Sequence, residues 1–142
     1  DRGCTRDQLV TFLWRAAGEP EPETTVNPFT DVKEGDYFYK AVLWAVENGV
    51  TTGKSETIFA PKETCTRAQI VTFIYRAAGE PKVDNAVNPF EDVSANAYYA
   101  DAVLWAVENG ITTGKTATRF APNDTCTRGQ GVTFLYRGIG LY

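Results

Sequence analysis

Apolar and polar positions recur along this chain at a helical spacing, in segments that return after a fixed step. Between residues 38 and 49, apolar side chains fall three and four positions apart, and Gly49 follows as a helix stop. The stretch 99–110 repeats the pattern. Each stretch predicts one short amphipathic helix. The expected buried faces are Phe38, Ala41, Val42, Ala45 and Val46 in the first copy, and Tyr99, Ala102, Val103, Ala106 and Val107 in the second.

A second helical pattern occurs three times, beginning at residues 5, 66 and 127. In each copy a Thr stands at the N-cap position and a Gln follows three residues later, which is the signature of a capping box. In the middle copy an apolar stripe follows, and Gly79 and Pro81 end the helix. Loops marked by Gly and Pro connect the predicted helices, and we expect Phe59 and Phe120 to hold these loops on the core.

The whole chain follows one repeat. Cys65 and Cys126 each lie 61 residues after the preceding equivalent cysteine, of which Cys4 is the first, and the segment N-P-F-x-D-V at residues 27 and 88 keeps the same step. Self-similarity at a fixed period predicts a repeat architecture. We divide the chain into the second half of a repeat (1–26), a complete repeat with its linker (27–87) and a second complete repeat (88–142).

The half repeat at the N-terminus contains a helix without the partner helix of its own unit. Its expected apolar face, made of Leu9, Phe12, Leu13 and Ala16, needs a cover. The simplest fold is an all-α bundle of tandem two-helix repeats in which three such helices surround a pseudo-threefold axis. The alternative is that a missing half repeat or another chain supplies the cover, which would give a homo-oligomer through the unpaired N-terminal half repeat.

Composition removes several classes of function. The 142 residues carry a formal charge of −4 with both signs mixed, which is not the basic pattern of a nucleic-acid-binding protein, and no apolar run predicts a membrane span. The chain contains no His and no repeated carboxylate pair, so we expect no catalytic residues and no cofactor. Three equivalent cysteines without a fourth ligand predict neither a disulfide framework nor a metal site. Because it opens at Asp1 inside a repeat, we expect a piece of a longer exported protein.

The order F-x-D-V, helix, N-G-[VI]-x-x-G, F-x-P and then T-R-x-Q at the start of a second helix resembles the S-layer homology (SLH) domain family. The resemblance covers essentially the whole chain. It implies a three-pronged helical bundle that is extracellular, in the bacterial cell wall or S-layer, and tethers exported proteins to the surface. It also implies a partner, the secondary cell-wall polysaccharide, held in grooves between repeats, often through a terminal pyruvylated sugar. Tyr37 and Tyr98 align with a Trp that the family commonly carries.

Three arginines are the first candidates for binding such a glycan: Arg6, Arg67 and Arg128. Each follows the N-cap Thr, where a cation is unfavourable by roughly 0.3–1 kcal/mol, yet all three copies carry it. The N–H groups of a helix start attract anions, and a guanidinium adds a two-pronged grip for a carboxylate such as that of a pyruvyl ketal. The alternative is a surface Arg paired with an acid such as Asp31 or Asp92.

The other candidates are equivalent pairs, each with a structural alternative. Tyr37 and Tyr98 are sugar platforms, mainly because the resemblance places them there. Trp44 and Trp105 stack on sugars or fill the core. Gly53 and Gly114 let backbone approach a ligand or form a tight turn, and Lys54 and Lys115 add charge or are merely solvated. The leading function is a non-catalytic anchor that binds anionic wall polysaccharide, and the alternative is a structural self-assembly module.

Overall fold

The computed structural model describes residues 3–83 and 87–139. Their secondary structure is helical, without any β-strand, so the predicted all-α class is confirmed. Capping boxes open the first and third helices at Thr5 and Thr66, as the Thr and Gln spacing predicts. The helices are α1 (Arg6–Ala16), α2 (Tyr39–Glu47), α3 (Arg67–Ala77), α4 (Ala100–Glu108) and α5 (Arg128–Ile139).

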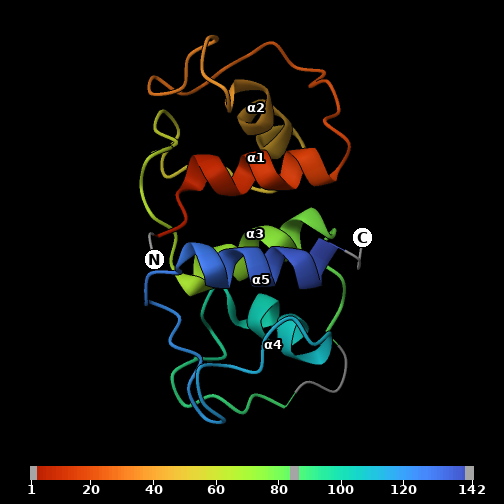
Figure 1. The fold of residues 1–142 in the computed structure, drawn as a ribbon, viewed down its shortest axis with the longest axis vertical. Coiled ribbons are helices and arrows are strands. Elements are labelled where there is room, and N and C mark those ends of the chain that lie inside the picture. Colours follow the sequence, from red (N-terminus) through yellow and green to blue (C-terminus); the bar gives the residue numbers. More distant parts are fainter. Residues whose placement is uncertain (1–2, 84–86, 140–142) are drawn as a thin grey trace.

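Helices pair across the boundaries of the repeats. α1 packs against α2 at one end of the molecule and α3 packs against α4 at the other, while α1, α3 and α5 contact one another in the middle (Figure 1). The N-terminal helix, predicted to lack the partner of its own unit, is therefore covered by α2 of the next unit together with α3 and α5. α1 buries Leu9, Val10 and Leu13, whereas Phe12 and Ala16, expected on its apolar face, are exposed because α2 covers a different side of the helix.

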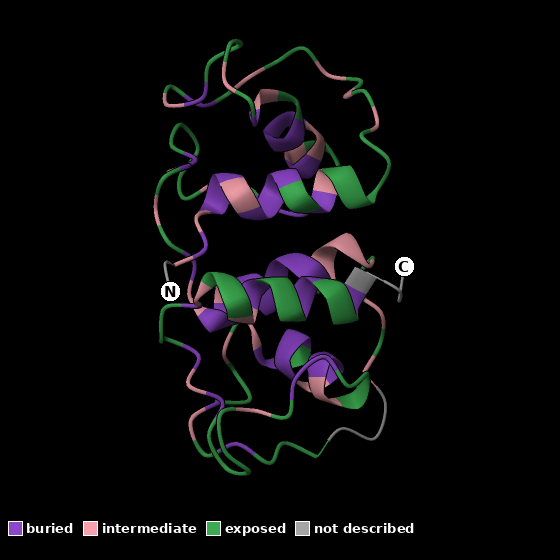
Figure 2. Ribbon diagram, viewed as in Figure 1, coloured by how far each residue is buried: buried purple, intermediate pink, exposed green. Residues whose placement is uncertain are grey.

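The helix with an open side is instead α5. Figure 2 shows its outward face as exposed along most of its length, in contrast to the buried faces of α2 and α4. Its Tyr136 is 82% exposed. At the equivalent position of α3, Tyr75 packs against Trp105 of α4 with ring centroids 5.5 Å apart. The described residues place no such helix over α5.

A closed ring of backbone hydrogen bonds joins the starts of the three central helices. Cys65 N donates to Cys4 O at 2.7 Å, Cys126 N to Cys65 O at 2.9 Å, and Cys4 N to Cys126 O at 3.0 Å. Isolated antiparallel bridges flank the ring, between residues 5 and 64, 66 and 125, and 3 and 127. The ring therefore sets the three helix starts beside one another.

The loop that follows α2 is held in place by a buried side chain and by a carboxylate. Phe59 is fully buried, as predicted, and the Asp31 carboxylate accepts the N–H groups of Phe59 at 2.9 Å and Ala60 at 2.8 Å. Asp92 makes the same two hydrogen bonds to Phe120 and Ala121 in the next repeat. These bonds hold Ala60 in the left-handed region, at φ 59°. Each loop is thus a rigid element on which a site can be built.

The cysteine side chains are buried and free. Burial raises the pKa of the Cys126 thiol to about 12, and it raises the pKa of Cys65 and Cys4 as well. Within residues 3–83 and 87–139, no group of three or more His, Cys, Asp or Glu side chains is placed to hold a metal ion. No helix in this part of the chain combines the length and apolar character needed to cross a membrane.

The raised thiol pKa predicts a loss of stability in alkali. The unfolded chain releases the Cys126 proton near its ordinary pKa of 9.0, while the folded protein retains it until about pH 12. The contribution of the protonated Cys126 thiol to stability is therefore complete below about pH 9, and it is lost as the pH rises from about 9 to about 12. We expect wild type to lose about 1.4 kcal/mol more per pH unit than Cys126→Ala between about pH 10 and 11.

Urea unfolding of both proteins under reductant measures this difference. Other groups that titrate in the same range, such as tyrosines, are common to both proteins and cancel. Parallel curves of unfolding free energy against pH would show that the thiol ionises equally well in the folded state.

Candidate functional site

Two pockets between the central helices are lined by equivalent residues. The first, the α1–α3 pocket, has a volume of about 230 Å³, and the second, the α1–α5 pocket, about 260 Å³. Each takes a Gln, a Thr, a Phe and an Arg from one helix, a Tyr from the loop before the next helix, and an Arg from the start of a neighbouring helix. These are Gln69, Thr72, Phe73, Arg76, Tyr98 and Arg6 in the α1–α3 pocket, and Gln8, Thr11, Phe12, Arg15, Tyr37 and Arg128 in the α1–α5 pocket.

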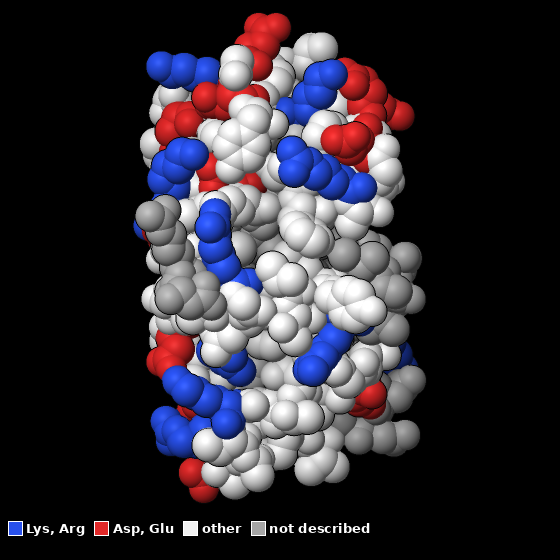
Figure 3. Space-filling view, in the orientation of Figure 1, with Lys and Arg blue, Asp and Glu red and all other residues white. Residues whose placement is uncertain are grey.

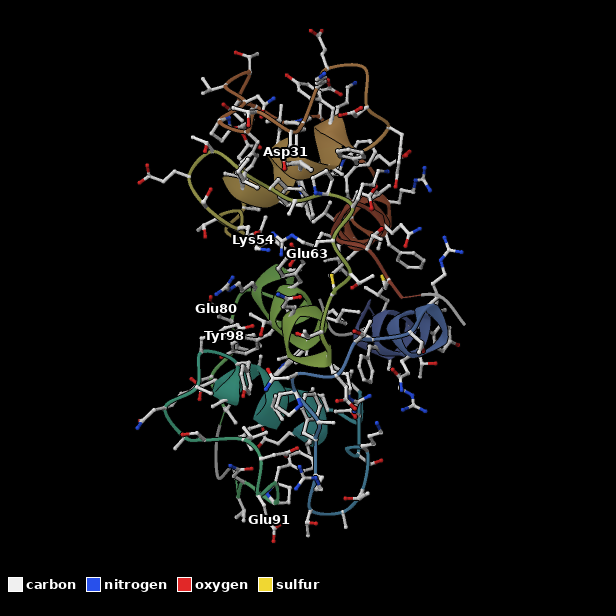
Figure 4. The ribbon with its side chains drawn as sticks, turned by 90° about the vertical axis from the view of Figure 1, so that its left-hand side faces the viewer. Asp31, Lys54, Glu63, Glu80, Glu91 and Tyr98 are labelled. Carbon is white, nitrogen blue, oxygen red and sulfur yellow. The ribbon has the colours of Figure 1, made fainter. Side chains whose placement is uncertain are left out.

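The spacing of these residues explains why they meet. Gln69, Thr72, Phe73 and Arg76 are separated by three, four and seven positions, so they share one face of α3. Tyr98 stands in the loop before α4 and is 63% exposed, and Tyr37 before α2 is 55% exposed. In Figure 4, Lys54 lies on one side of α3 and Tyr98 on the other, both at the face turned to the viewer. A ligand in the α1–α3 pocket therefore meets side chains from all three units of the chain, with Arg6 from the first and Tyr98 from the third.

Arg6 is a buried cation on the wall of the α1–α3 pocket. It is only 5% exposed, its Nε donates to Phe59 O at 2.8 Å, and its guanidinium lies over the Phe59 ring at 4.8 Å. Its Nη2 is buried without a hydrogen-bond partner. Burial lowers the pKa of Arg6, although an arginine stays charged. The pocket wall thus contains a fixed positive charge.

Arg67 takes the same position in the next repeat, and Arg128 does not. Arg67 is 4% exposed, donates from Nε to Phe120 O at 2.9 Å and lies over the Phe120 ring at 4.9 Å. Arg128 is exposed and lines the α1–α5 pocket. The difference follows from the loops, because residues 59–63 cover Arg6 and residues 120–124 cover Arg67.

The same loops correct one expectation about the helix starts. The sequence predicts free N–H groups there that attract an anion. In α1 the N–H of Arg6 donates to Glu63 O and that of Asp7 to Pro61 O, each at 2.9 Å, and in α3 the N–H groups of Arg67 and Ala68 donate to the carbonyls of residues 124 and 122. These donors of α1 and α3 are therefore used inside the protein, since the loop of the following repeat caps each helix.

Gly53 belongs to the α1–α3 pocket and is also required by packing. Its φ is 90°, and an added Cβ would lie 2.4 Å from Phe29 Cε1. Gly114 repeats both features, with φ 91° and a contact of 2.4 Å to Phe90. The tight turn, which was the alternative interpretation, thus accounts for both glycines, and only Gly53 also lines one of the two pockets.

The lysines and tryptophans divide between the pocket and the core. Lys54 lines the α1–α3 pocket and pairs with Glu63, whereas Lys115 pairs with Asp124 at 2.7 Å outside both pockets. Trp105 is 4% exposed and Trp44 is half-buried against the core, and neither lines the two pockets. The positions of both tryptophans fit the core alternative.

Sequence reasoning missed Arg15 and Arg76. Each lies nine residues after the arginine at the start of its own helix. Each also lies seven residues after the Gln of the capping box, so it falls on the same helix face as that Gln. Both carry a weak pairing to a glutamate four residues later, at 4.0 and 3.9 Å. A polar stripe at helical spacing that recurs with the repeat was the available signal.

Comparison with known proteins gives a consistent result. The family model for the S-layer homology domain matches residues 28–71 and 89–130. The chain is 41% identical to the surface-layer 125 kDa protein of Lysinibacillus sphaericus over 77% of its length, and 36% identical to an endoglucanase of Bacillus sp. (strain KSM-635) over 81%. It is 28% identical to a cell surface protein of Thermoanaerobacter kivui over 80%. The chain spans only 9%, 12% and 16% of these relatives' own lengths.

The packing at Gly53 predicts a large cost for a methyl group. Gly53→Ala places a Cβ against Phe29 and forces an L-residue into a left-handed conformation, so we expect a loss of roughly 2–4 kcal/mol in the free energy of unfolding. Gly35→Ala is the matched control, because an added Cβ there meets nothing within 4 Å. Urea unfolding at neutral pH compares the two variants, and equal stabilities would contradict the packing seen at this loop.

Proposed function

The chain belongs to the S-layer homology domain family, and from that premise we propose that it is a non-catalytic anchoring module whose two pockets bind an anionic secondary cell-wall polysaccharide. SLH domains anchor surface proteins to the cell wall by binding its polysaccharide, and the chain is an extracellular, wall-associated segment. The similarity covers only a small part of the length of the endoglucanase and of the two surface proteins. This supports a separate anchoring role for the matched segment.

The observation that carries the proposal is the recurrence of six equivalent residues, of five types, in two pockets. The α1–α3 pocket combines the guanidinium groups of Arg6 and Arg76 with the Lys54 ammonium, and the α1–α5 pocket combines Arg15 and Arg128. In each, an exposed tyrosine ring stands beside the cations. Two cations and an aromatic face suit a sugar that carries a carboxylate, such as a pyruvyl ketal.

The charge distribution on one face of the molecule supports an anionic ligand. Figure 3 shows acidic side chains mainly toward the two ends of the molecule, whereas the central band carries cations set in uncharged surface. Among the residues that the structure describes, neither pocket has an acidic lining residue, so in this part of the chain no pair of carboxylates of the kind a glycoside hydrolase needs lines either pocket. Two weak sites on one polymer would also add by avidity, which suits an anchor.

We expect pocket arginines to control the affinity for wall polysaccharide. Arg128→Ala and Arg76→Ala each remove one charge-assisted contact from a different pocket, which predicts about tenfold to hundredfold weaker binding at that pocket and a near-complete loss in the double variant. Arg119→Ala, an exposed arginine that lines neither pocket, is the control.

Calorimetric titration with purified secondary wall polysaccharide, before and after removal of its pyruvyl groups, measures these effects. Unchanged affinity in the double variant, or equal affinity for both forms of the polymer, would overturn the proposal.

One observation favours the alternative, a self-assembly module, at a different helix from the one expected. α5 exposes Val132 by 52% and Tyr136 by 82%, and the equivalent faces of α1 and α3 are covered by α2 and α4. If assembly is the function, Tyr136→Ser will convert an oligomer to a monomer while leaving glycan affinity unchanged. Sedimentation equilibrium of both proteins tests this, and a wild type that stays monomeric at high concentration removes the alternative.

A further inference from the structure

We propose that Asp7 is a positioning residue that fixes Tyr37 as the sugar platform of the α1–α5 pocket. This inference rests on the proposed function, because it assigns the tyrosine ring to glycan binding. It goes beyond that function because Asp7 lies outside the pocket lining and because its hydrogen bond to the tyrosine hydroxyl has no equivalent in the next repeat.

Asp7 is a buried carboxylate with a full set of donors. Its side chain is 1% exposed. Its Oδ2 accepts the Tyr37 hydroxyl at 2.9 Å and Lys62 Nζ at 2.7 Å, while its Oδ1 accepts Gln8 N at 2.8 Å and the hydroxyl of Thr5. Burial alone would raise the pKa of Asp7, but these hydrogen bonds, led by Lys62, outweigh it and hold the pKa below its usual range. The acceptor for Tyr37 is therefore charged and immobile.

Tyr37 is held at its hydroxyl and along its ring. The hydroxyl is bound to Asp7, the ring edge packs at 90° against Phe38 with centroids 5.0 Å apart, and Lys62 Nζ lies 5.5 Å from the ring centroid. More than half of its surface remains exposed, and its side chain is part of the lining of the α1–α5 pocket. A ring fixed in this way presents its face to a ligand without further ordering.

The other repeats lack this tether. Ala68 and Gly129 occupy the positions equivalent to Asp7, and Asn123 occupies the position equivalent to Lys62. Tyr98 lines the α1–α3 pocket with the same packing against its neighbour, at 5.0 Å between ring centroids, but no carboxylate stands at residue 68 to receive its hydroxyl. The comparison isolates the tether as the difference between two otherwise equivalent platforms.

Fixing one side chain before binding removes an ordering cost that the ligand would otherwise meet. For a single immobilised side chain this corresponds to about threefold to tenfold in affinity. Lys62 neutralises the Asp7 charge, so the buried carboxylate does not repel an anionic sugar from Arg15 and Arg128. The gain in affinity from the ordered Tyr37 ring is thus obtained without electrostatic repulsion between Asp7 and the sugar.

The test measures binding of a methyl hexoside carrying a pyruvyl ketal in an Arg76→Ala background, which removes the contribution of the α1–α3 pocket. We expect Asp7→Ala to weaken binding about threefold to tenfold, and Asp7→Asn to weaken it less, since an amide oxygen still accepts the Tyr37 hydroxyl. Tyr37→Phe keeps the ring, deletes only the donor at an exposed site and predicts the same loss as Asp7→Ala, so the test stands even if Asp7→Ala folds poorly.

A second readout follows the tether itself. Burial first, and then the hydrogen bond to Asp7, raises the pKa of Tyr37 to about 12. In Asp7→Ala this pKa is expected to fall toward 10, measured by NMR of carbon-labelled tyrosine with Tyr37→Phe as the assignment control. A merely stabilising Asp7 would change the unfolding free energy without changing this titration.

The reverse experiment introduces the Asp and Lys pair at the equivalent positions beside Tyr98. Ala68→Asp with Asn123→Lys, in an Arg128→Ala background, is expected to tether Tyr98 and to tighten binding of the same probe at the α1–α3 pocket by about threefold to tenfold. Equal affinity of Asp7→Ala, Tyr37→Phe and their parent overturns the positioning role and leaves the proposed function intact. Absence of any binding by the unmodified chain overturns the proposed function, and the positioning role with it.

Discussion

The ring of backbone hydrogen bonds among Cys4, Cys65 and Cys126 is the constraint on which the rest of the structure depends. A buried N–H or C=O without a partner costs about 1–3 kcal/mol, so the three extended segments before the central helices satisfy one another. Each copy supplies a buried cysteine where these segments meet. Because the ring fixes all three helix starts, it also fixes the backbone positions of the three arginines that follow two residues later.

From this ring each repeat is completed by the next. The helix that ends one unit packs against the helix that begins the following unit, and the loop at 59–63 closes over Arg6 and accepts the first N–H groups of α1. The stability of a repeat therefore depends on its neighbour, as in other repeat proteins. The pockets form where one unit's loop meets another unit's helix, so binding depends on the same contacts as folding.

Local features of the fold were predictable from sequence, and the pairing of faces was not. Thr5 and Gln8 identify a helix start, and the apolar Phe59 between loop residues identifies an anchor, because both signals depend on neighbouring residues alone. The partner of α1 depends on which helix reaches Leu9 and Leu13 in space, which periodicity does not contain. Arg76 was missed for a related reason, since a charged residue on a helix surface has the same local pattern whether it faces solvent or a pocket.

The burial of Arg6 could be predicted least of all, and it shows how the two pockets differ. In the α1–α3 pocket the fold has already removed Arg6 from water and fixed it on Phe59 O, so an anion meets an ordered charge in a medium of low dielectric. In the α1–α5 pocket Arg128 is exposed and must be ordered by the ligand. There the ordered group is the tyrosine, tied to Asp7. Equivalent residues thus give two sites that are preorganised in different ways, one through its cation and the other through its aromatic ring.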